Sequence, residues 1–539
     1  MNNLLQTYLS DVRQIYSTGA ATKETSFYTP LANLFNRVGD SLKPRIKCVV
    51  NIKNQGAGIP DGGFFTASQL KKDEENPLAT LPPERGVLEV KSAREDVEKI
   101  AQSEQIEKYL RKYGQVLVTN LRDFLLLAKD ENGATIRLER FTLADGENEF
   151  REMLRLGLDD FAGERETRFA EYLKRVFLHA APIAAPEEVA FFLASYARDA
   201  KARIEANKDF PALENLKNAL AEALGIRFTD EKGEKFFRST LVQTLFYGIF
   251  SAWVLHSRKH QNKQKFDWHT AAWELRVPMI RALFEQIATP SKLKPLGLTE
   301  VLDWASAVLN RVNKAEFFRK FEQEHAVQYF YEPFLQAFDP ELRRELGVWY
   351  TPGEIVRYMV ERVDRTLREE LHIADGLANE NVFVLDPCCG TGAYLVEVLR
   401  RIDKTLKQNG ADALSGSDLK RAACERIFGF EILPAPFVVA HLQLGLILQN
   451  LGSPLDDDRD ERVGVYLTNA LTGWNPAKEP KTHLLFPEME GERDRAEAVK
   501  RDKPILVILG NPPYNAFAGT SPKEEQGLVD VYKKGLISD

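Results

Sequence analysis

Cysteine is scarce in this sequence of 539 residues, which contains four: Cys48, Cys388, Cys389 and Cys424. None of the spacings between them is that of a zinc motif, and the adjacent pair Cys388 and Cys389 cannot form an ordinary disulfide bridge. A disulfide-stabilised secreted scaffold is therefore excluded, and we expect the protein in a reducing cytoplasm.

Long hydrophobic runs are also missing. One apolar stretch, Leu241–Leu255, is interrupted by Gln243 and Thr244. It is shorter than the roughly 20 residues that a membrane-spanning helix needs. We expect a buried helix there and no membrane partner. The segment Met1–Tyr16 is amphipathic and lacks the apolar core of a signal peptide, so we do not expect export.

The sequence has no excess of positive charge, because 72 Lys and Arg stand against 79 Asp and Glu, for a net charge of -7. This balance argues against autonomous tight binding to nucleic acid, although the local field matters more than the sum. No Walker phosphate loop is present either. Its absence argues against an ATP-driven translocase in this chain.

The composition that remains is that of a globular protein with ample core, with 44% hydrophobic and 28% charged residues. The length is sufficient for about three domains. We expect them at residues 1–150, 151–326 and 327–539.

The most informative motif follows the apolar run Ile505–Leu509 and consists of Asn511, Pro512, Pro513 and Tyr514. The side-chain oxygen of Asn511 and the carbonyl of Pro512 can accept the two hydrogens of a planar amino group, which activates its nitrogen for attack on a methyl group. The prolines fix φ and supply no competing donors. Tyr514 offers a ring on which an extruded base can stack. The motif predicts a methyltransferase active site.

A second motif lies upstream, where an apolar strand, a glycine loop and a helical run follow one another: Val382–Leu385, then Asp386, Pro387, Cys388, Cys389, Gly390, Thr391 and Gly392, then Ala393–Ile402. Glycines allow close approach of the backbone to a ligand, and the helix start offers amide donors. The loop is neither a dehydrogenase fingerprint nor a Walker loop. It predicts a site for an adenosyl ligand without phosphates.

Two further strand ends carry polar residues. The apolar run Ile427–Phe430 ends in Glu431, whose carboxylate can accept hydrogen bonds from both ribose hydroxyls. Gly464–Leu467 leads to Asn469, which can contact the adenine amino group of the cofactor. The order of strands and helical runs predicts a parallel sheet of the doubly wound α/β class.

These motifs carry a family resemblance. Asp386–Gly392 resembles the cofactor loop of amino-group DNA methyltransferases, and Asn511–Tyr514 resembles the catalytic motif of their adenine-N6 branch. Gly347–Pro352, before the helical run Gly353–Leu367, is similar to the motif of that family that contacts the methionine end of S-adenosylmethionine. The order of the motifs resembles the gamma arrangement.

The resemblance implies S-adenosylmethionine as the methyl donor and a set of binding residues: Tyr350, Thr351, Pro352, Asp386, Pro387, Gly390, Gly392, Glu431 and Asn469. It assigns Thr351 and Pro352 to the methionine pocket, Asp386 to the methionine amino group and Glu431 to the ribose. Double-stranded DNA is the implied substrate. Because Tyr514 lies close to the last residue, we expect a methyltransferase core truncated after this motif, with target recognition supplied by a missing region or a separate chain.

The N-terminal part contains a second constellation of charged residues. Asp61 precedes the expected strand Gly86–Val90, which holds Glu89 and is followed by Lys91. Glu89 and Lys91 are two positions apart, so both side chains leave the same face of the strand. Two carboxylates beside a lysine can bind a divalent metal ion and steady a hydroxide that attacks a phosphate.

This pattern resembles the PD-(D/E)xK nucleases. Glu24, on a preceding helical segment, stands where that family often has an extra acid, and Gln105 with Tyr109 resembles its Gln-xxx-Tyr element. The resemblance implies Mg²⁺-dependent DNA cleavage, with the metal ion at Asp61 and Glu89.

The region between the two constellations has helical periodicity and carries no chemical motif. His256, His260 and His269 invite interpretation as a metal cluster, but their scatter among Arg and Lys residues favours a basic surface. We expect this region to connect the nuclease-like and methyltransferase-like parts.

Taken together, the motifs resemble the single-chain type IIG restriction-modification enzymes. The implied architecture is a restriction-endonuclease-like domain, a helical connector and a Rossmann-like methyltransferase core. Three alternatives stay open: a cytosine-N4 DNA methyltransferase, a protein glutamine methyltransferase, and a DNA-binding or assembly subunit without turnover.

Overall fold

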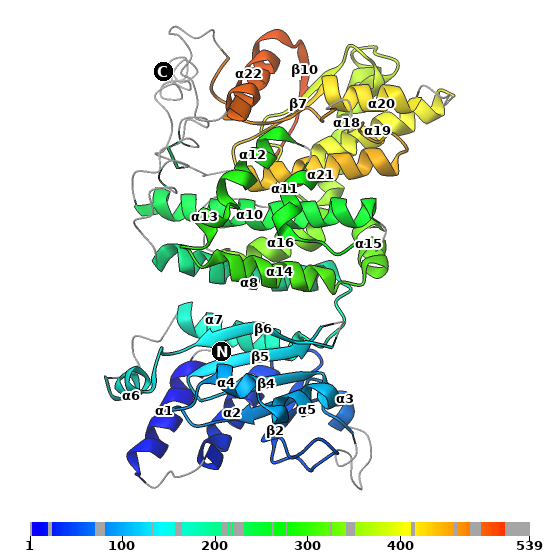
Figure 1. Cartoon of the computed structure of the whole chain (residues 1–539). Helices are drawn as coiled ribbons and strands as arrows, with labels where there is room; N and C mark the ends of the chain where they lie inside the picture. The colour runs from blue at the N-terminus through cyan, green and yellow to red at the C-terminus, as the bar shows by residue number, and fades with distance from the viewer. Residues whose placement is uncertain are drawn as a thin grey trace, which may run out of the picture. The chain divides into compact units, whose positions relative to one another are not determined.

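The computed structural model forms two compact units, Met1–Ile183 and Ala184–Asp539 (Figure 1). It describes residues 3–19, 24–70, 81–130, 133–156, 164–206, 214, 217–218, 221, 231–260, 264–275, 277–323, 326–340, 351–410, 415–456, 461–474 and 487–512.

The first unit is built on a six-stranded sheet in the order β1-β2-β3-β4-β5-β6. Its strands are β1 Ile46–Val50, β2 Gly62–Thr66, β3 Val87–Val90, β4 Gln115–Thr119, β5 Asp123–Lys129 and β6 Thr135–Thr142. Only β3 and β4 pair in parallel, and the other neighbours are antiparallel. The helices are α1 Leu4–Ser17, η1 Glu24–Phe27, α2 Tyr28–Gly39, α3 Ala67–Leu70, α4 Val97–Ala101, α5 Glu104–Tyr113, α6 Glu147–Leu156 and α7 Glu164–Leu178.

Both faces of this sheet are covered, and alternate residues of β3 point to opposite faces. Leu88 and Val90 belong to the core formed with α1, α2 and α7, whereas Val87 belongs to the core formed with α4 and α5. The first core includes Phe169 and Phe177 of α7. The first unit therefore extends to residue 183 instead of ending near residue 150.

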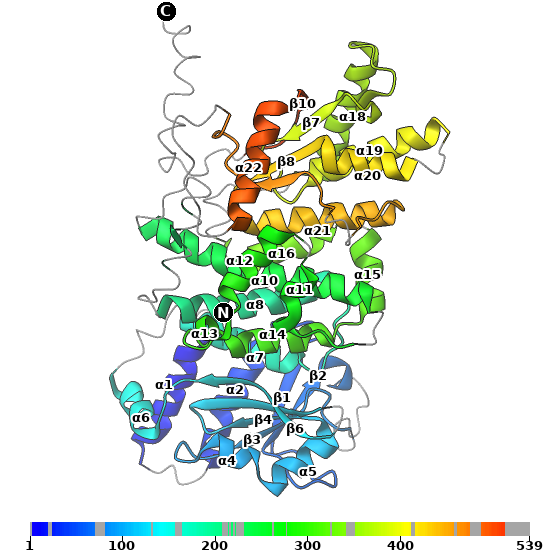
Figure 2. The ribbon, with the colours of Figure 1, turned by 45° about the horizontal axis from the view of Figure 1, so that its top comes forward.

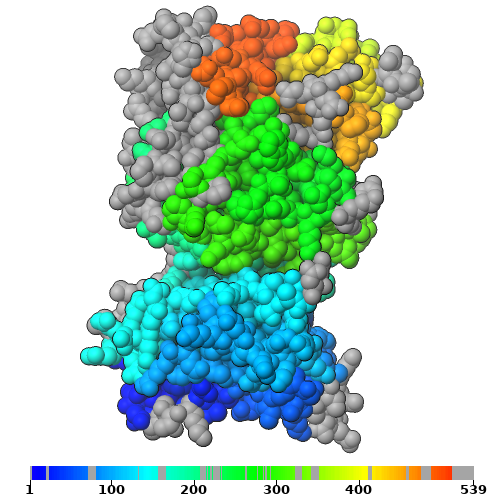
Figure 3. Space-filling view, in the orientation of Figure 1, coloured from blue at the N-terminus to red at the C-terminus, as the bar shows by residue number. Residues whose placement is uncertain are grey.

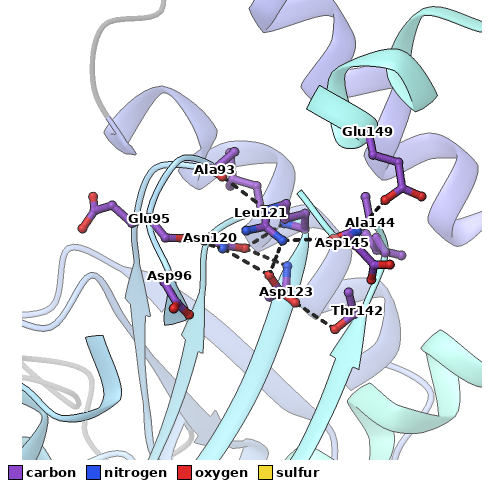
Figure 4. A network of polar contacts seen from close by, with 12 residues as sticks. Ala93, Glu95, Asp96, Asn120, Leu121, Asp123, Thr142, Ala144, Asp145 and Glu149 are labelled. Atoms are coloured by element: carbon purple, nitrogen blue, oxygen red, sulfur yellow. Dashed lines mark hydrogen bonds and ion pairs between the residues drawn. The ribbon is translucent and has the colours of Figure 1, made fainter. Parts of the chain in front are cut away.

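A buried carboxylate holds the turn between β4 and β5 (Figure 4). Asp123 accepts hydrogen bonds from Arg140 Nη2 at 2.6 Å and Thr142 Oγ1 at 2.8 Å, and it pairs with Arg122 at 2.7 Å. Within the turn Leu121 has a φ of 76°, and Asn120 Oδ1 accepts from the Asp123 amide at 2.7 Å. Asp123 therefore balances the positive charges of two arginines and supports a strained turn.

The second unit begins with helices that form one continuous body, green in the space-filling view (Figure 3). They are α8 Pro186–Ala206, α10 Glu231–Lys259, η3 Trp268–Thr270, α11 Ala271–Glu274, α12 Pro278–Ile287, α13 Pro290–Leu293, α14 Leu298–Asn310, α15 Lys314–Gln323 and α16 Ala326–Phe338. Leu241–Leu255 lies inside α10 and is largely buried, as expected. Among the described helices, none combines the length and the apolar composition of a membrane span.

The rest of the second unit is a four-stranded parallel sheet in the order β10-β7-β8-β9. Its strands are β7 Phe383–Asp386, β8 Ile427–Glu431, β9 Val465–Leu467 and β10 Ile505–Ile508. The helices are α18 Gly353–Glu369, η4 Gly376–Ala378, α19 Ala393–Gln408, α20 Ser415–Glu425, α21 Pro434–Asn450 and α22 Pro487–Asp502. The predicted strands agree with the observed ones to within one residue at each end.

Helices lie on both sides of this sheet, with α22 on one side and α19 and α20 on the other (Figure 2). Ala496 and Val499 of α22 pack against Phe428 and Phe430 of β8. Helix α21 is apolar around most of its circumference because it is buried between the sheet and α10. No boundary near residue 326 divides the second unit.

The Asp123 contacts allow a stability test of the first unit. Asp123→Ala removes the carboxylate shared by two arginines, and we expect a loss of about 3 kcal/mol and a midpoint lower by roughly 6–12 °C. Scanning calorimetry of the full chain measures this in the transition of the first unit. Glu104→Ala, at a side chain that is 92% exposed, is the control and should shift that midpoint little. Equal midpoints for the two variants would contradict the assigned role of Asp123.

Candidate active sites

The strand order of the parallel sheet creates the first site. The chain passes from β7 to β8 and β9 on one side and then returns to place β10 on the other side of β7. Ligands of open α/β sheets bind where the order reverses, at the carboxyl ends of the strands. Asp386 ends β7, and Asn511 follows β10, so the two motifs meet at this point.

Gly510 lies between these two motifs, against the Asp386 side chain. A Cβ atom at position 510 would lie 2.4 Å from Asp386 Oδ1 and 3.5 Å from Pro387 Cδ. A larger residue at position 510 would therefore have to displace the Asp386 carboxylate. Glycine leaves room for this carboxylate where the end of β10 meets the glycine loop.

Asp386 is buried and has one oxygen without a protein partner among the described residues. Its Oδ1 accepts from the Cys388 amide at 3.1 Å, whereas Oδ2 accepts no hydrogen bond. Burial raises the pKa of Asp386 to about 7, and the negative charge of Glu431 adds to the effect. A buried carboxylate in this state suits a cationic ligand group such as an ammonium.

Glu431 lies at the end of the neighbouring strand β8. Its Oε1 accepts from the amides of Ile432 at 2.9 Å and Leu433 at 2.8 Å, which fixes the side chain at the start of α21. Burial raises the pKa of Glu431 to about 7. The fixed carboxylate is suited to accept hydrogen bonds from ligand hydroxyls.

The glycine loop between Asp386 and α19 has a left-handed backbone at two positions, with φ of 55° at Gly390 and 91° at Gly392. No atom lies within 4 Å of a Cβ built on Gly390. Thr391 is tied to α21, because its carbonyl accepts from Gln443 Nε2 at 2.7 Å. The loop is thus anchored, and its backbone is open to a ligand at Gly390.

Asn511 contacts a residue 160 positions earlier in the chain. Its Nδ2 donates to Thr351 Oγ1 at 3.0 Å. With Nδ2 bonded to Thr351, the amide oxygen points away from that hydroxyl. Pro352, next to Thr351, precedes α18 and accepts from the amides of Ile355 and Val356. The predicted residues Tyr350, Pro513 and Tyr514 lie outside the described residues.

Lys500 of α22 is buried, although no motif in the sequence marks it. Its Nζ donates to Thr468 Oγ1 at 2.9 Å, to the Asn469 carbonyl at 2.7 Å and to the Thr472 carbonyl at 2.8 Å. It thereby holds the segment after β9, where Asn469 Oδ1 accepts from the Leu471 amide at 2.9 Å. In the sequence Lys500 cannot be distinguished from the exposed charged residues beside it. Only the packing of α22 shows that it is buried.

The second site lies in the first unit, where β2 and β3 adjoin. Asp61 Oδ2 accepts from the Val90 amide at 2.7 Å, and Asp61 Oδ1 accepts from the Tyr28 hydroxyl. Lys91 Nζ donates to Glu89 Oε1 at 2.5 Å. Asp61, Glu89 and Lys91 are therefore brought together.

Glu89 is buried, and its Oε2 accepts no hydrogen bond from the described residues. Burial raises the pKa of Glu89 to about 7, the Asp61 charge adds to this, and Lys91 opposes it. A divalent cation bound at Oε2 would offset the cost of burying the negative charge of Glu89.

The remaining predicted residues of this site lie around it. Gln105 Nε2 donates to the Tyr109 hydroxyl at 2.7 Å on α5, the helix that covers the Glu89 face of β3. The negative charge of Glu24, in η1, makes a small further contribution to raising the pKa of Glu89. Asp61, Glu89 and Glu24 do not form a group with all ligand atoms within 4.8 Å among the described residues.

The expectation of a basic surface is wrong for His256. This residue is buried and lies 3.2 Å from Glu274, while His269 is exposed and bonds Asp267. The basic residues near His256 in the sequence gave no sign of this burial. It arises because α10 directs the His256 side chain into the protein.

The raised pKa of Asp386 predicts pH-dependent ligand binding. The empty folded protein holds a proton here between the ordinary carboxyl pKa and about pH 7, so its stability falls as the pH rises through that range. A ligand ammonium requires the ionised carboxylate. We therefore expect calorimetry to show affinity for S-adenosylmethionine roughly five- to tenfold stronger at about pH 7.5 than at about pH 6.

Asp386→Asn is the control for this measurement. It should bind more weakly and lose the part of the pH dependence that Asp386 contributes, while Glu431, whose pKa is also about 7, retains its own part. Equal affinity of the unsubstituted protein at both pH values would remove Asp386 from the role of ammonium partner.

Residues 322–531 match the family model N-6 DNA Methylase. The chain is 31% identical over 221 residues to the type I restriction enzyme EcoEI methylase subunit of Escherichia coli, an alignment that covers 41% of this chain and 32% of that protein. The chain thus spans about a third of the length of this curated relative.

Several solved structures of restriction-modification enzymes are also similar. A DrdV–DNA complex has a TM-score of 0.41 and 19% identity, covering 95% of this chain and 43% of that one. The DNA-bound type ISP enzyme LlaBIII has a TM-score of 0.41 and 22% identity, covering 61% and 20%. The type IIG endonuclease BpuSI has a TM-score of 0.24 and 13% identity, covering 83% and 42%.

The family match encloses α18 to β10, including Thr351, Asp386, Glu431 and Asn511. The residues at the carboxyl ends of the parallel strands therefore lie inside the family match. The C-terminal part of the chain is an N6 DNA methyltransferase domain.

Proposed function

We propose that the chain transfers a methyl group from S-adenosylmethionine to the N6 amino group of adenine in double-stranded DNA. The observation that carries this proposal is the juxtaposition of Asn511 with Asp386 at the strand reversal, where Gly510 leaves room for the Asp386 carboxylate. It puts acceptors for an amino group beside an unpartnered carboxylate suited to the ammonium of the cofactor.

The cofactor, when bound, supplies the electrophilic methyl group. Asp386 Oδ2 would hold its amino group, Glu431 its ribose hydroxyls, and the backbone at Gly390 and Gly392 would lie against it. Tyr350, Thr351, Pro352, Pro387 and Asn469 complete the proposed binding set.

The protein acts on the amino group through Asn511 and Pro512. Their oxygens would accept the two amino hydrogens, which moves the lone pair of the nitrogen out of conjugation with the ring. Thr351 positions Asn511 for this, since an amide whose NH₂ is engaged presents its oxygen to the substrate. Pro513 would stiffen the turn and Tyr514 would stack on the base.

A second proposed activity is Mg²⁺-dependent cleavage of DNA by the first unit. It rests on the convergence of Asp61, Glu89 and Lys91 and on the buried, unbonded Glu89 Oε2. Asp61 and Glu89 would hold the metal ion, Lys91 would steady the attacking hydroxide, and Glu24 and Gln105 would support the site. With both activities the chain would act in restriction and modification, in the manner of a type IIG enzyme.

Target recognition is proposed to come from another chain or another region. The relative in Escherichia coli is by its name a methylase subunit, which is compatible with a division of these tasks between chains. The four cysteines are unpaired, which supports a reducing cytoplasm as the location.

Methylation is tested by single-molecule sequencing of DNA from cells that express the chain. We expect N6-methyladenine at a defined motif. Asn511→Ala should lower the rate about 100- to 1,000-fold, the effect of removing one preorganised polar group.

Two further variants at Thr351 test whether its hydroxyl, rather than the volume of its side chain, positions Asn511. Thr351→Val removes the acceptor of the Asn511 amide at nearly constant volume and should reduce the rate less, while Thr351→Ser should retain it. Methylation of cytosine instead would select the N4 alternative, and cofactor binding without methylation of any DNA would favour an assembly subunit.

Cleavage is tested separately with Mg²⁺ and DNA. Asp61→Ala and Lys91→Ala should abolish cutting and leave methylation intact, because their side chains belong to the other unit. Lys99→Ala, an exposed lysine on α4, is the matched control and should cut normally. Cutting that persists in both site variants would rule out this metal site.

A further inference from the structure

Three potential metal ligands meet where α10 ends, and none of them belongs to either proposed active site. His256 and His260 are four residues apart and therefore share one face of the helical turn. Glu274, the last residue of α11, faces them. The ligand atoms of the three residues lie within 4.8 Å of one another, and this is the only such group in the parts of the chain that the structure describes.

The hydrogen bonds of His256 call for a cation between it and Glu274. His256 Nε2 lies 3.2 Å from the Gln264 carbonyl, which can only accept, so Nε2 carries the hydrogen. A neutral imidazole then has a bare Nδ1, and this atom lies 3.2 Å from Glu274 Oε1. Two lone pairs facing each other are repulsive unless a second proton or a metal ion lies between them.

His260 extends the arrangement beyond a simple ion pair. Its Nε2 lies 3.7 Å from the same Glu274 oxygen, and the two imidazole centroids are 4.5 Å apart. Zinc bound at about 2.0–2.1 Å in a tetrahedral site separates its ligand atoms by roughly 3.3 Å. The two separations from Glu274, 3.2 and 3.7 Å, bracket that value.

The surroundings are those of a supported metal ligand. The His256–Gln264 contact is the outer hydrogen bond that normally fixes the tautomer of a metal-bound histidine. The ring edge contact with Phe266, at 5.7 Å between centroids, helps to exclude water from buried His256. Arg258 is directed elsewhere, with Nη1 donating to Gln449 at 2.8 Å.

We propose that His256, His260 and Glu274 bind a zinc ion, with a fourth position for water. Imidazole nitrogens favour zinc over magnesium, which distinguishes this site from the proposed nuclease site. The ion would fasten the end of α10 to α11. Because α10 packs against α21, it would stabilise the helical support of the methyltransferase sheet.

The test uses the full chain purified without a polyhistidine tag. After gel filtration in metal-free buffer, zinc content is measured by mass spectrometry, and Co²⁺ is added to a stripped sample for visible spectroscopy. We expect one zinc ion per chain and the absorption bands of tetrahedral cobalt. His260→Ala and Glu274→Gln should each weaken zinc binding by more than the roughly 10- to 100-fold that loss of an outer-shell partner causes.

Glu274→Gln is the decisive variant because its amide can donate to the bare Nδ1 of His256 and preserve the fold without a cation. His269→Ala is the matched control, since that histidine is exposed and bonds Asp267 instead. Zinc should raise the melting temperature of the unsubstituted protein and of His269→Ala but not of Glu274→Gln. No zinc uptake by the unsubstituted protein, or equal uptake by Glu274→Gln, would overturn the proposal and leave a protonated His256 as the cation.

Discussion

The close contact between the ends of β7 and β10 is the constraint on which the methyltransferase domain depends. Gly510 lies where any Cβ would strike Asp386, and the register of two parallel strands holds both backbones in place. This contact brings the start of the glycine loop beside the start of the Asn-Pro-Pro-Tyr motif. The hydrogen bond from Asn511 to Thr351 then adds the segment before α18 to the same point. Three segments distant in sequence thereby form one proposed site.

Both proposed active sites contain a buried carboxylate with an oxygen that has no partner among the described residues. Asp386 and Glu89 each have a pKa raised to about 7, mainly by burial. Burying an unpaired carboxylate costs stability, and a cationic ligand group relieves that cost. In one site the proposed cation is an ammonium, and in the other it is a metal ion. Under these proposals, one kind of buried carboxylate would bind two different cationic groups, and the shape of each site and its neighbouring donors would decide which ligand fits.

The helical part of the second unit is more than a spacer between motifs. It shares a compact unit with the methyltransferase sheet, and α21 is buried between the sheet and α10. Glu431 is bonded to the amide at the start of α21, and Gln443 of α21 holds the glycine loop. Because α10 packs against α21, it supports the helix that positions both parts of the proposed cofactor site. The proposed zinc site at the end of α10 belongs to this support.

The sequence by itself determined the strands, the loops that follow them and most proposed site residues. Apolar runs broken by Asp-Pro, glycine or Asn-Pro-Pro are local signals, so β7, β8, β9 and β10 could be located within a residue. Tertiary structure decided what depends on contacts between distant segments. Lys500 lies among similar charged residues, and only the orientation of α22 buries its ammonium against three oxygens. His256 and Glu274 likewise became partners because α10 and α11 pack together. Local sequence specifies backbone conformation, whereas burial and partner choice arise only when the segments pack.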